Sequence, residues 1–386
     1  MCIPPFAAVL LIAALVLGVE YWLRGQRLVT QVVTAQAELS VQGLLQPSGE
    51  CHHELRAGRV VRLAQADGDV VSVRINAEGL RGEAVAVGSE SSYRILVLGD
   101  DVVFGGWLPE SKTLPGQLKS LFADRTQMQL EVLNGGVPGY CPLLSGLRFR
   151  GLRELRPDLV IVHVDMSDVD DDAVYRGLTS ERGGRVVCVH PSERQVTPGP
   201  QLPLPGWLQR SALFERSVLA MRHDVPPLLA VASQASGQQR FAWISDRGGN
   251  RKLEIEHALQ PLADLRRDVE SLGARLLVST CPVVWQVVDG RRVAELSRRC
   301  QIRGATPCGS REPFLALAEF CARERIRLVD ASDQFRAWEE PLELFSLDSP
   351  VPSARGLGVY AAAIADYIVR NPPREWDVEA AAGGAN

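Results

Sequence analysis

The sequence predicts an α/β fold built on a doubly wound parallel sheet. Five short, almost wholly apolar runs cover residues 94–98, 130–133, 159–164, 274–279 and 326–329. Runs of this kind are typical of strands buried on both faces, as in parallel sheets. Helical patterns stand between and after them, at residues 114–122, 143–155, 255–272, 313–323 and 356–369. Strands that alternate with helices indicate βαβ units, and therefore one sheet with helices on both faces.

Length and charge limit the classes of protein to which the chain can belong. Its 386 residues suffice for one large α/β domain with additions, and a hydrophobic content of 46% allows a sizeable core. The net charge is −4, and no run of Lys and Arg forms a basic stripe. We therefore expect no nucleic-acid partner.

The first residues are different in character. Ile3 to Val19 is an apolar run without a charge, followed by Tyr21 and Trp22. About 20 apolar residues span a bilayer as a helix, and Tyr and Trp suit its interface. We expect residues 1–24 to be an uncleaved transmembrane anchor. A buried core helix and a cleaved signal peptide are the alternatives, but the basic segment that opens a signal peptide is missing.

The membrane side depends on few residues. Arg24 and Arg27, taken alone, favour a cytoplasmic position for the residues after the apolar run. Two arginines decide little, and we expect a single-pass membrane protein whose soluble domain is extracytoplasmic. The polar, helix-permissive residues 25–48 would form a stalk.

A small β appendage is predicted at residues 49–92, before the main domain at residues 93–370. Two alternating stretches, residues 59–63 and 70–75, are separated by Asp67-Gly68, which is a hairpin signal. The main domain contains a Pro- and Gly-rich insertion at residues 173–239, which would be a lid or a surface loop. The Ala- and Gly-rich tail, residues 371–386, is expected to be disordered.

The eight cysteines do not decide the redox compartment. Cys300 and Cys308 flank a short loop and would be either a local disulfide or two unrelated thiols. No cysteine pair has the spacing of a metal site, and no cofactor is expected.

Ligands of open α/β sheets bind beyond the carboxyl ends of the strands, so the residues after each run are the candidates for a site. Gly99-Asp100-Asp101 follows the first run, and Asn134-Gly135-Gly136-Val137-Pro138-Gly139-Tyr140 follows the second. Asp165-Met166-Ser167-Asp168 follows the third run, and Asp348-Ser349-Pro350-Val351 precedes the last helical pattern.

These four blocks, from about residue 93 to residue 368, resemble those of the SGNH (GDSL-type) ester-hydrolase superfamily. The resemblance implies a three-layer α/β/α sandwich with a five-stranded, flavodoxin-like sheet. In that family a serine after the first strand is the nucleophile, and its N–H, a glycine N–H and an asparagine form the oxyanion hole. An Asp-x-x-His pair supplies the base. By position these roles fall on Asp101 (nucleophile), Gly136 (oxyanion glycine), Ser167 (oxyanion asparagine), Asp348 (triad aspartate) and Val351 (histidine).

The departures from the family pattern remove the chemistry that the family performs. Asp101 has no hydroxyl group, and attack by its carboxylate on an acyl carbon would give an anhydride. Val351 accepts no proton, and no histidine follows His257. Asp165 replaces a glycine, whereas Asp100 and Asp168 match the family. We therefore predict little or no esterase activity by the family mechanism.

Three histidines and one cysteine are candidates to replace the missing base or nucleophile. His163 is expected to be a core histidine, while His190 and His223 lie in the insertion and could approach the site. Cys141 follows the second block, but nothing gives it a base, so a buried structural thiol is expected.

Three hypotheses of function follow. The chain is an inactive binding protein for an acylated carbohydrate or lipid-like ligand, or a hydrolase with altered, carboxylate-based chemistry, or a structural module of an envelope assembly. For the second, five aspartates would converge as acid and base or as ligands of a hard cation. They are Asp100, Asp101, Asp165, Asp168 and Asp348. The alternative for residues 168–172 is a solvated acidic loop. The oligomeric state stays open.

Overall fold

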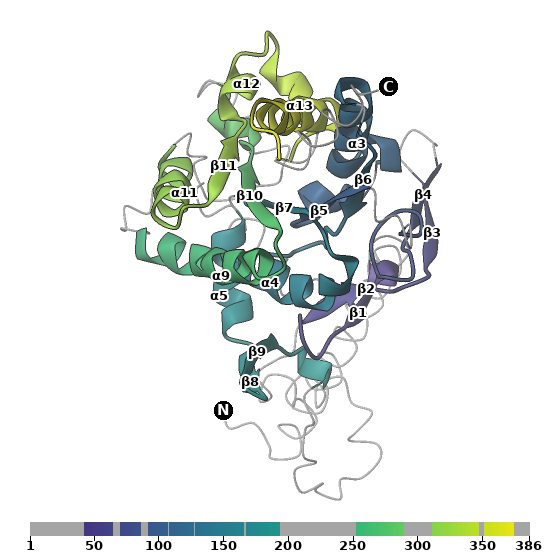
Figure 1. Cartoon of the computed structure of the whole chain (residues 1–386), viewed down its shortest axis with the longest axis vertical. Coiled ribbons are helices and arrows are strands. Elements are labelled where there is room, and N and C mark those ends of the chain that lie inside the picture. Colours follow the sequence, from purple (N-terminus) through teal and green to yellow (C-terminus); the bar gives the residue numbers. More distant parts are fainter. Residues whose placement is uncertain are drawn as a thin grey trace, which may run out of the picture.

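A sheet of five parallel strands forms the centre of the molecule, in the spatial order β11–β10–β7–β5–β6 (Figure 1). The strands are β5 (Tyr93–Leu98), β6 (Leu130–Asn134), β7 (Leu159–His163), β10 (Arg275–Thr280) and β11 (Arg327–Asp330). Each coincides with one of the five predicted runs. The first strand, β5, lies between β6 and β7, so the chain winds outward in both directions. The predicted doubly wound sheet is confirmed, and its switch point lies between β5 and β7.

This architecture is that of a computed structural model, which describes residues 42–64, 70–85, 92–106, 108–126, 128–165, 167–193, 252–288, 311–346 and 351–373. Several predicted features lie outside these residues. They are the anchor (1–24), most of the stalk, the insertion beyond residue 193, the tail from residue 374, Asp348, His223, Cys300 and Cys308. Within the described ranges, no helix combines the length and the apolar character needed to cross a membrane.

Helices cover both faces of the sheet, because successive side chains of a strand point to opposite sides. Ile95 and Val97 belong to a core shared with α3 (Leu114–Arg125) and α13 (Ala354–Arg370). Leu96 and Leu98 belong to the opposite core, with α4 (Pro142–Gly151), α9 (Lys252–Glu270) and α11 (Glu312–Arg323). Figure 1 shows the sheet between these two layers. The three-layer α/β/α arrangement is therefore confirmed.

The β appendage consists of two antiparallel pairs. The strands β1 (Leu45–Pro47) and β2 (His53–Leu55) pair, as do β3 (Val60–Ala64) and β4 (Val70–Arg74), where the hairpin was predicted. The 3-10 turn η1 (Gln42–Leu44) precedes them, and Leu44 and Leu45 are fully buried. Residues 42–47, which were expected to be part of the stalk, therefore form η1 and β1.

Arg81 ties the appendage to the main domain. It forms a β-bridge with Asn134, and its guanidinium donates to the carbonyls of Phe104 and Gly105 at 2.6 Å and to that of Leu108. The guanidinium also lies over the Phe104 ring, 5.1 Å from its centroid.

The described start of the insertion has regular secondary structure. Helix α5 (Asp168–Arg176) leads into a hairpin of β8 (Thr179–Arg182) and β9 (Arg185–Cys188). The backbone of Cys188 forms an isolated β-bridge with that of Cys51 in the appendage, and both thiols are free. The remaining short elements are α2 (Asp101–Phe104), η2 (Glu110–Lys112), η3 (Arg153–Leu155), η4 (Pro191–Glu193), η6 (Val284–Gln286), α12 (Ser332–Arg336) and η7 (Pro341–Leu344).

Candidate active site

The nucleophile position is at the first residue of α2, directly beyond the carboxyl end of β5. Asp100 caps this short helix, because its Oδ1 accepts a hydrogen bond from the N–H of Val102 at 2.9 Å. Asp100 is 3% exposed, whereas Asp101 is half-buried. The turn of the chain therefore buries the aspartate that matches the family and brings Asp101 towards the surface.

The loop after β6 presents the backbone N–H of Gly139 to Asp101. The amide nitrogen of Gly139 lies 3.3 Å from Asp101 Oδ2. Gly139 has a φ of +75°, in the left-handed region that favours glycine. The N–H of Gly136, by contrast, donates to Oδ1 of Asn134 at 3.1 Å. The N–H that faces Asp101 is therefore that of Gly139, whereas the N–H of Gly136 is bonded within its own loop.

Gly136 has a packing role instead. A Cβ atom at this position would lie 2.4 Å from the backbone nitrogen of Phe104. The dipeptide Pro138-Gly139 was the available signal for the donor, because a glycine after proline is typical of a turn with positive φ.

Ser167, at the oxyanion asparagine position, is turned to a different carboxylate. Its N–H and its hydroxyl both donate to Oδ1 of Asp165, each at 2.7 Å. Ser167 is 2% exposed, and a hydroxyl has a single proton to donate. Its donor capacity is therefore committed to Asp165.

The acidic stretch from Asp168 to Asp172 is not the solvated loop that was considered. It forms the first turns of α5, and Asp168, Asp171 and Asp172 are all buried. Asp168 Oδ2 accepts from the N–H of Asp165 at 2.8 Å. Burial, followed by the negative charges of Asp165 and Asp100, raises the pKa of Asp168 well above its usual value.

Val351 stands at the histidine position, on the segment just before α13. It is half-buried and packs against the apolar core on the α3 and α13 side of the sheet. Its side chain has no proton-accepting atom. Asp348, the expected triad aspartate, lies outside the described residues.

His53 of the appendage lies beside the oxyanion loop, although it was not among the candidates. Its Nε2 is 2.8 Å from the carbonyl oxygen of Pro138, and its Nδ1 is 2.9 Å from Nδ1 of His52. Both ring nitrogens are therefore engaged with groups other than Asp101. Burial lowers the pKa of His53 to about 4, against the opposing effects of the Pro138 carbonyl and the charge of Asp101. No sequence signal links His53 to this loop, because the two are 85 positions apart.

Two of the other candidate substitutes, His190 and Cys141, lie within the described residues. His190 makes an edge contact with the ring of His52, with 4.7 Å between ring centroids. Cys141 is 1% exposed, and burial raises the pKa of its thiol well above the usual value. The prediction of a buried thiol is confirmed.

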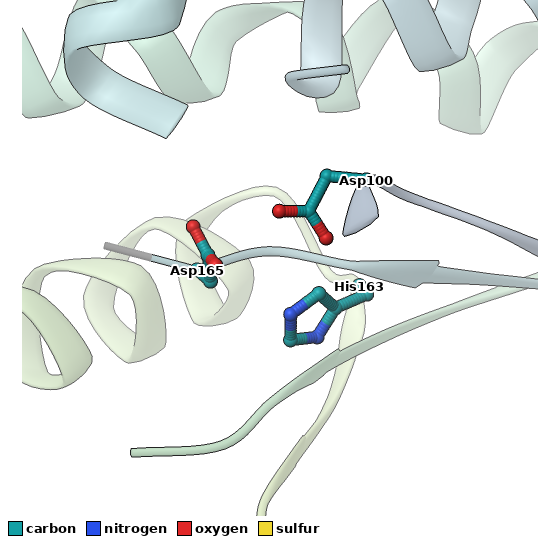
Figure 2. Close-up of side chains that lie close together, drawn as sticks. All are labelled: Asp100, His163 and Asp165. Atoms are coloured by element: carbon teal, nitrogen blue, oxygen red, sulfur yellow. The ribbon is translucent and has the colours of Figure 1, made fainter. Parts of the chain in front are cut away.

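Three of the acidic and histidine side chains converge at the ends of β5 and β7. One ligand-type atom from each of Asp100, His163 and Asp165 lies within 4.8 Å of those of the other two. Figure 2 shows both carboxyl groups and the imidazole ring turned towards one another. His163 is 3% exposed, as expected of a core histidine, and burial lowers its pKa to about 4.

Comparisons with known proteins find likeness in structure only. No family model and no curated protein matches the chain. Among solved structures, TesA is 13% identical, with 71% of this chain and 97% of that one covered and a TM-score of 0.39. An acetylxylan esterase from Geobacillus stearothermophilus is 13% identical over 72% and 94%, with a TM-score of 0.37. A GDSL-like lipase from Bacteroides thetaiotaomicron is 11% identical over 74% and 93%, with a TM-score of 0.37.

The likeness is distant, and the assignment of the fold rests on the strand order and helix layers described above.

Proposed function

We propose that the chain is an SGNH-type, ester-hydrolase-like protein that binds its ligand without hydrolysing it. The observation that carries this proposal is the hydrogen bond from the Gly139 N–H to the Asp101 carboxylate. An oxyanion hole works because its donors are preorganised for a charge that develops only in the transition state. A carboxylate that is already in contact with the donor supplies this negative charge permanently.

The second expected donor supports the same proposal. The Ser167 hydroxyl is bound to Asp165, so two of the three expected donors of the oxyanion hole are paired with carboxylates of the protein itself. An ester oxygen that approached them would have to displace a charged acceptor, which makes the stronger hydrogen bond. The developing negative charge would also meet the negative charge of Asp101.

Proton transfer is missing as well. Val351 cannot accept a proton, and His53 directs its two ring nitrogens to Pro138 and His52. Loss of a triad member in hydrolases leaves roughly 10³-fold acceleration over water, which comes from binding and the oxyanion hole. Here the oxyanion hole is also altered, so the residual rate should be lower.

The ligand class and the location follow from the sequence. By family resemblance the ligand is an acylated carbohydrate or a lipid-like molecule. The apolar run before Val19 would hold the protein in a membrane as a single-pass anchor, with the soluble domain on the extracytoplasmic side. The alternative to a binding role is an active hydrolase with a carboxylate-based site.

The test restores the missing chemistry in the full chain. Hydrolysis of a short-chain aryl ester is measured for the wild type, for Asp101→Ser/Val351→His and for the control Asp101→Ala/Val351→His. We expect turnover from the serine variant alone, because only it combines a nucleophile with a base. A fluorophosphonate probe should likewise label only this variant.

Wild-type turnover well above the buffer rate, abolished by Asp101→Ala, would contradict the proposal and establish the carboxylate-based hydrolase. If all three proteins are folded and inert, the pocket itself is not that of an esterase, and the family resemblance of the site is wrong.

A further inference from the structure

We propose that Asp100, His163 and Asp165 form a binding site for a divalent transition-metal ion of the zinc class. This site is separate from the nucleophile position, and the inference holds whether or not the protein hydrolyses esters. Asp100 lies shortly after the end of β5. His163 is the last residue of β7, and Asp165 lies two residues beyond it. The site therefore lies at the switch point of the sheet, where ligands of open α/β folds bind.

The state of the His163 ring points to a cation. Its Nδ1 lies 2.8 Å from the hydroxyl of Tyr360, and that hydroxyl donates its proton to Oγ of Ser279 at 2.7 Å. A hydroxyl has one proton, so Tyr360 accepts from His163 and the ring proton is on Nδ1. The other nitrogen, Nε2, then has a lone pair. It is buried and has no hydrogen-bond partner.

This lone pair faces negative charge, as Figure 2 shows a ring nitrogen turned towards the carboxyl groups. An imidazole lone pair beside one buried and one half-buried carboxylate is unfavourable unless a cation lies between them. A metal-bound histidine also donates its other ring N–H to a neighbouring acceptor, which fixes the tautomer and the ring. The contact of Nδ1 with Tyr360 is an arrangement of this kind.

The two carboxylates are held in place in the same manner. One oxygen of Asp100 caps α2 by accepting from Val102, and one oxygen of Asp165 accepts two hydrogen bonds from Ser167. In the described part of the chain, no Lys or Arg forms an ion pair with Asp165. A divalent ion would balance the two negative charges.

The donor set selects the class of metal. One imidazole nitrogen and two carboxylate oxygens suit Zn²⁺, which often has three protein ligands and one open position. Mg²⁺ and Ca²⁺ prefer oxygen alone. Bonds of about 2 Å place such ligand atoms roughly 3–4 Å apart, so atoms that lie within 4.8 Å of one another need to move by no more than roughly 1–2 Å. A cavity of about 20 Å³ that borders Asp165, Asp168 and Thr280 has room for one water.

The experiment measures binding of Zn²⁺ alone to the full chain after treatment with a chelator. Calorimetry on the wild type is compared with Asp165→Asn and His163→Gln, and with Asp172→Asn and His53→Gln as controls. The controls remove a buried aspartate and a buried histidine outside the site. We expect a weakening of at least about 100-fold in the site variants and none in the controls, since even outer partners of a metal are worth 10–100-fold.

Two further measurements keep the result interpretable. Co²⁺ in place of Zn²⁺ should give visible absorption bands without the thiolate charge-transfer band that a cysteine ligand would produce. Tyr360→Phe, which removes the partner of Nδ1, should weaken Zn²⁺ binding by about tenfold. Unchanged Zn²⁺ affinity in folded Asp165→Asn, a thiolate band, or no binding of Zn²⁺ to the wild type would each overturn the proposal.

Discussion

Asp101 Oδ2 accepts a hydrogen bond from the backbone N–H of Gly139, with 3.3 Å between oxygen and nitrogen. The nucleophile position and the oxyanion loop are thus joined within the protein itself. In the proposed function this contact matters, because the Asp101 carboxylate interacts with the donor that a substrate would need.

Removal of the Asp101 carboxylate should destabilise the fold only slightly. Asp101→Ala removes the hydrogen bond from the Gly139 N–H to a half-buried side chain, which costs about 1 kcal/mol in the free energy of unfolding. Urea denaturation measures this cost. Asp124→Ala, at an exposed position of α3, is the control and should change stability by less than about 0.5 kcal/mol. A cost above roughly 3 kcal/mol would mean that Asp101 has a structural role beyond this contact.

Substitution of Arg81 should detach the appendage from the main domain. Arg81→Met removes the charged donor of three hydrogen bonds to the carbonyls of Phe104, Gly105 and Leu108, at a cost of about 3 kcal/mol. The matched control is Arg74→Met, because the Arg74–Glu83 pair is exposed and should contribute less than about 1 kcal/mol. Chemical denaturation of both variants checks the difference, and equal effects would refute the assignment.

Gly136→Ala should be strongly destabilising although it adds one methyl group. Its Cβ would lie 2.4 Å from the nitrogen of Phe104, so backbone must move, and overpacking of this kind costs about 1–3 kcal/mol. Gly151→Ala is the control, since nothing lies within 4 Å of its added Cβ. There the substitution should be neutral or stabilising by up to about 1 kcal/mol, because Gly151 is helical. Thermal unfolding separates the two.

Acid should destabilise the protein through His53. Its pKa falls from 6.5 to about 4 on folding, so between these values the unfolded chain binds a proton that the folded protein does not. The free energy of unfolding should therefore decrease as the pH falls from 6.5 to about 4, by about 1.4 kcal/mol per pH unit. Above pH 6.5 His53 is neutral in both states, so it no longer affects how the free energy of unfolding depends on pH.

The variant His53→Gln isolates that effect from other groups that titrate in the same range. His52, His163 and His190 also have lowered pKa values and act in the same direction, while Asp168 and Asp172 have raised pKa values and act in the opposite one. Denaturation curves at pH 7, 6 and 5 should show a shallower dependence for His53→Gln than for the wild type. Parallel curves would rule out His53 as a source of the acid sensitivity.

The central sheet could be predicted because its signal is local. A strand buried on both faces must be apolar at nearly every position, so β5 and β7 stand out as short runs without reference to the rest of the chain. The same is true of the hairpin of β3 and β4. The boundary of the appendage was less accurate, since Leu44 and Leu45 are buried by contacts that no local pattern reveals.

The chain by itself determined which residue types stand at the candidate site, and therefore that Asp101 and Val351 cannot perform serine-hydrolase chemistry. Only the tertiary structure decided which groups meet. It placed the N–H of Gly139, and not that of Gly136, beside the Asp101 carboxylate. It also brought His53 to the oxyanion loop and paired Ser167 with Asp165. The physical reason is that a hydrogen bond depends on distance and direction between atoms, which sequence spacing does not specify once the chain folds back on itself.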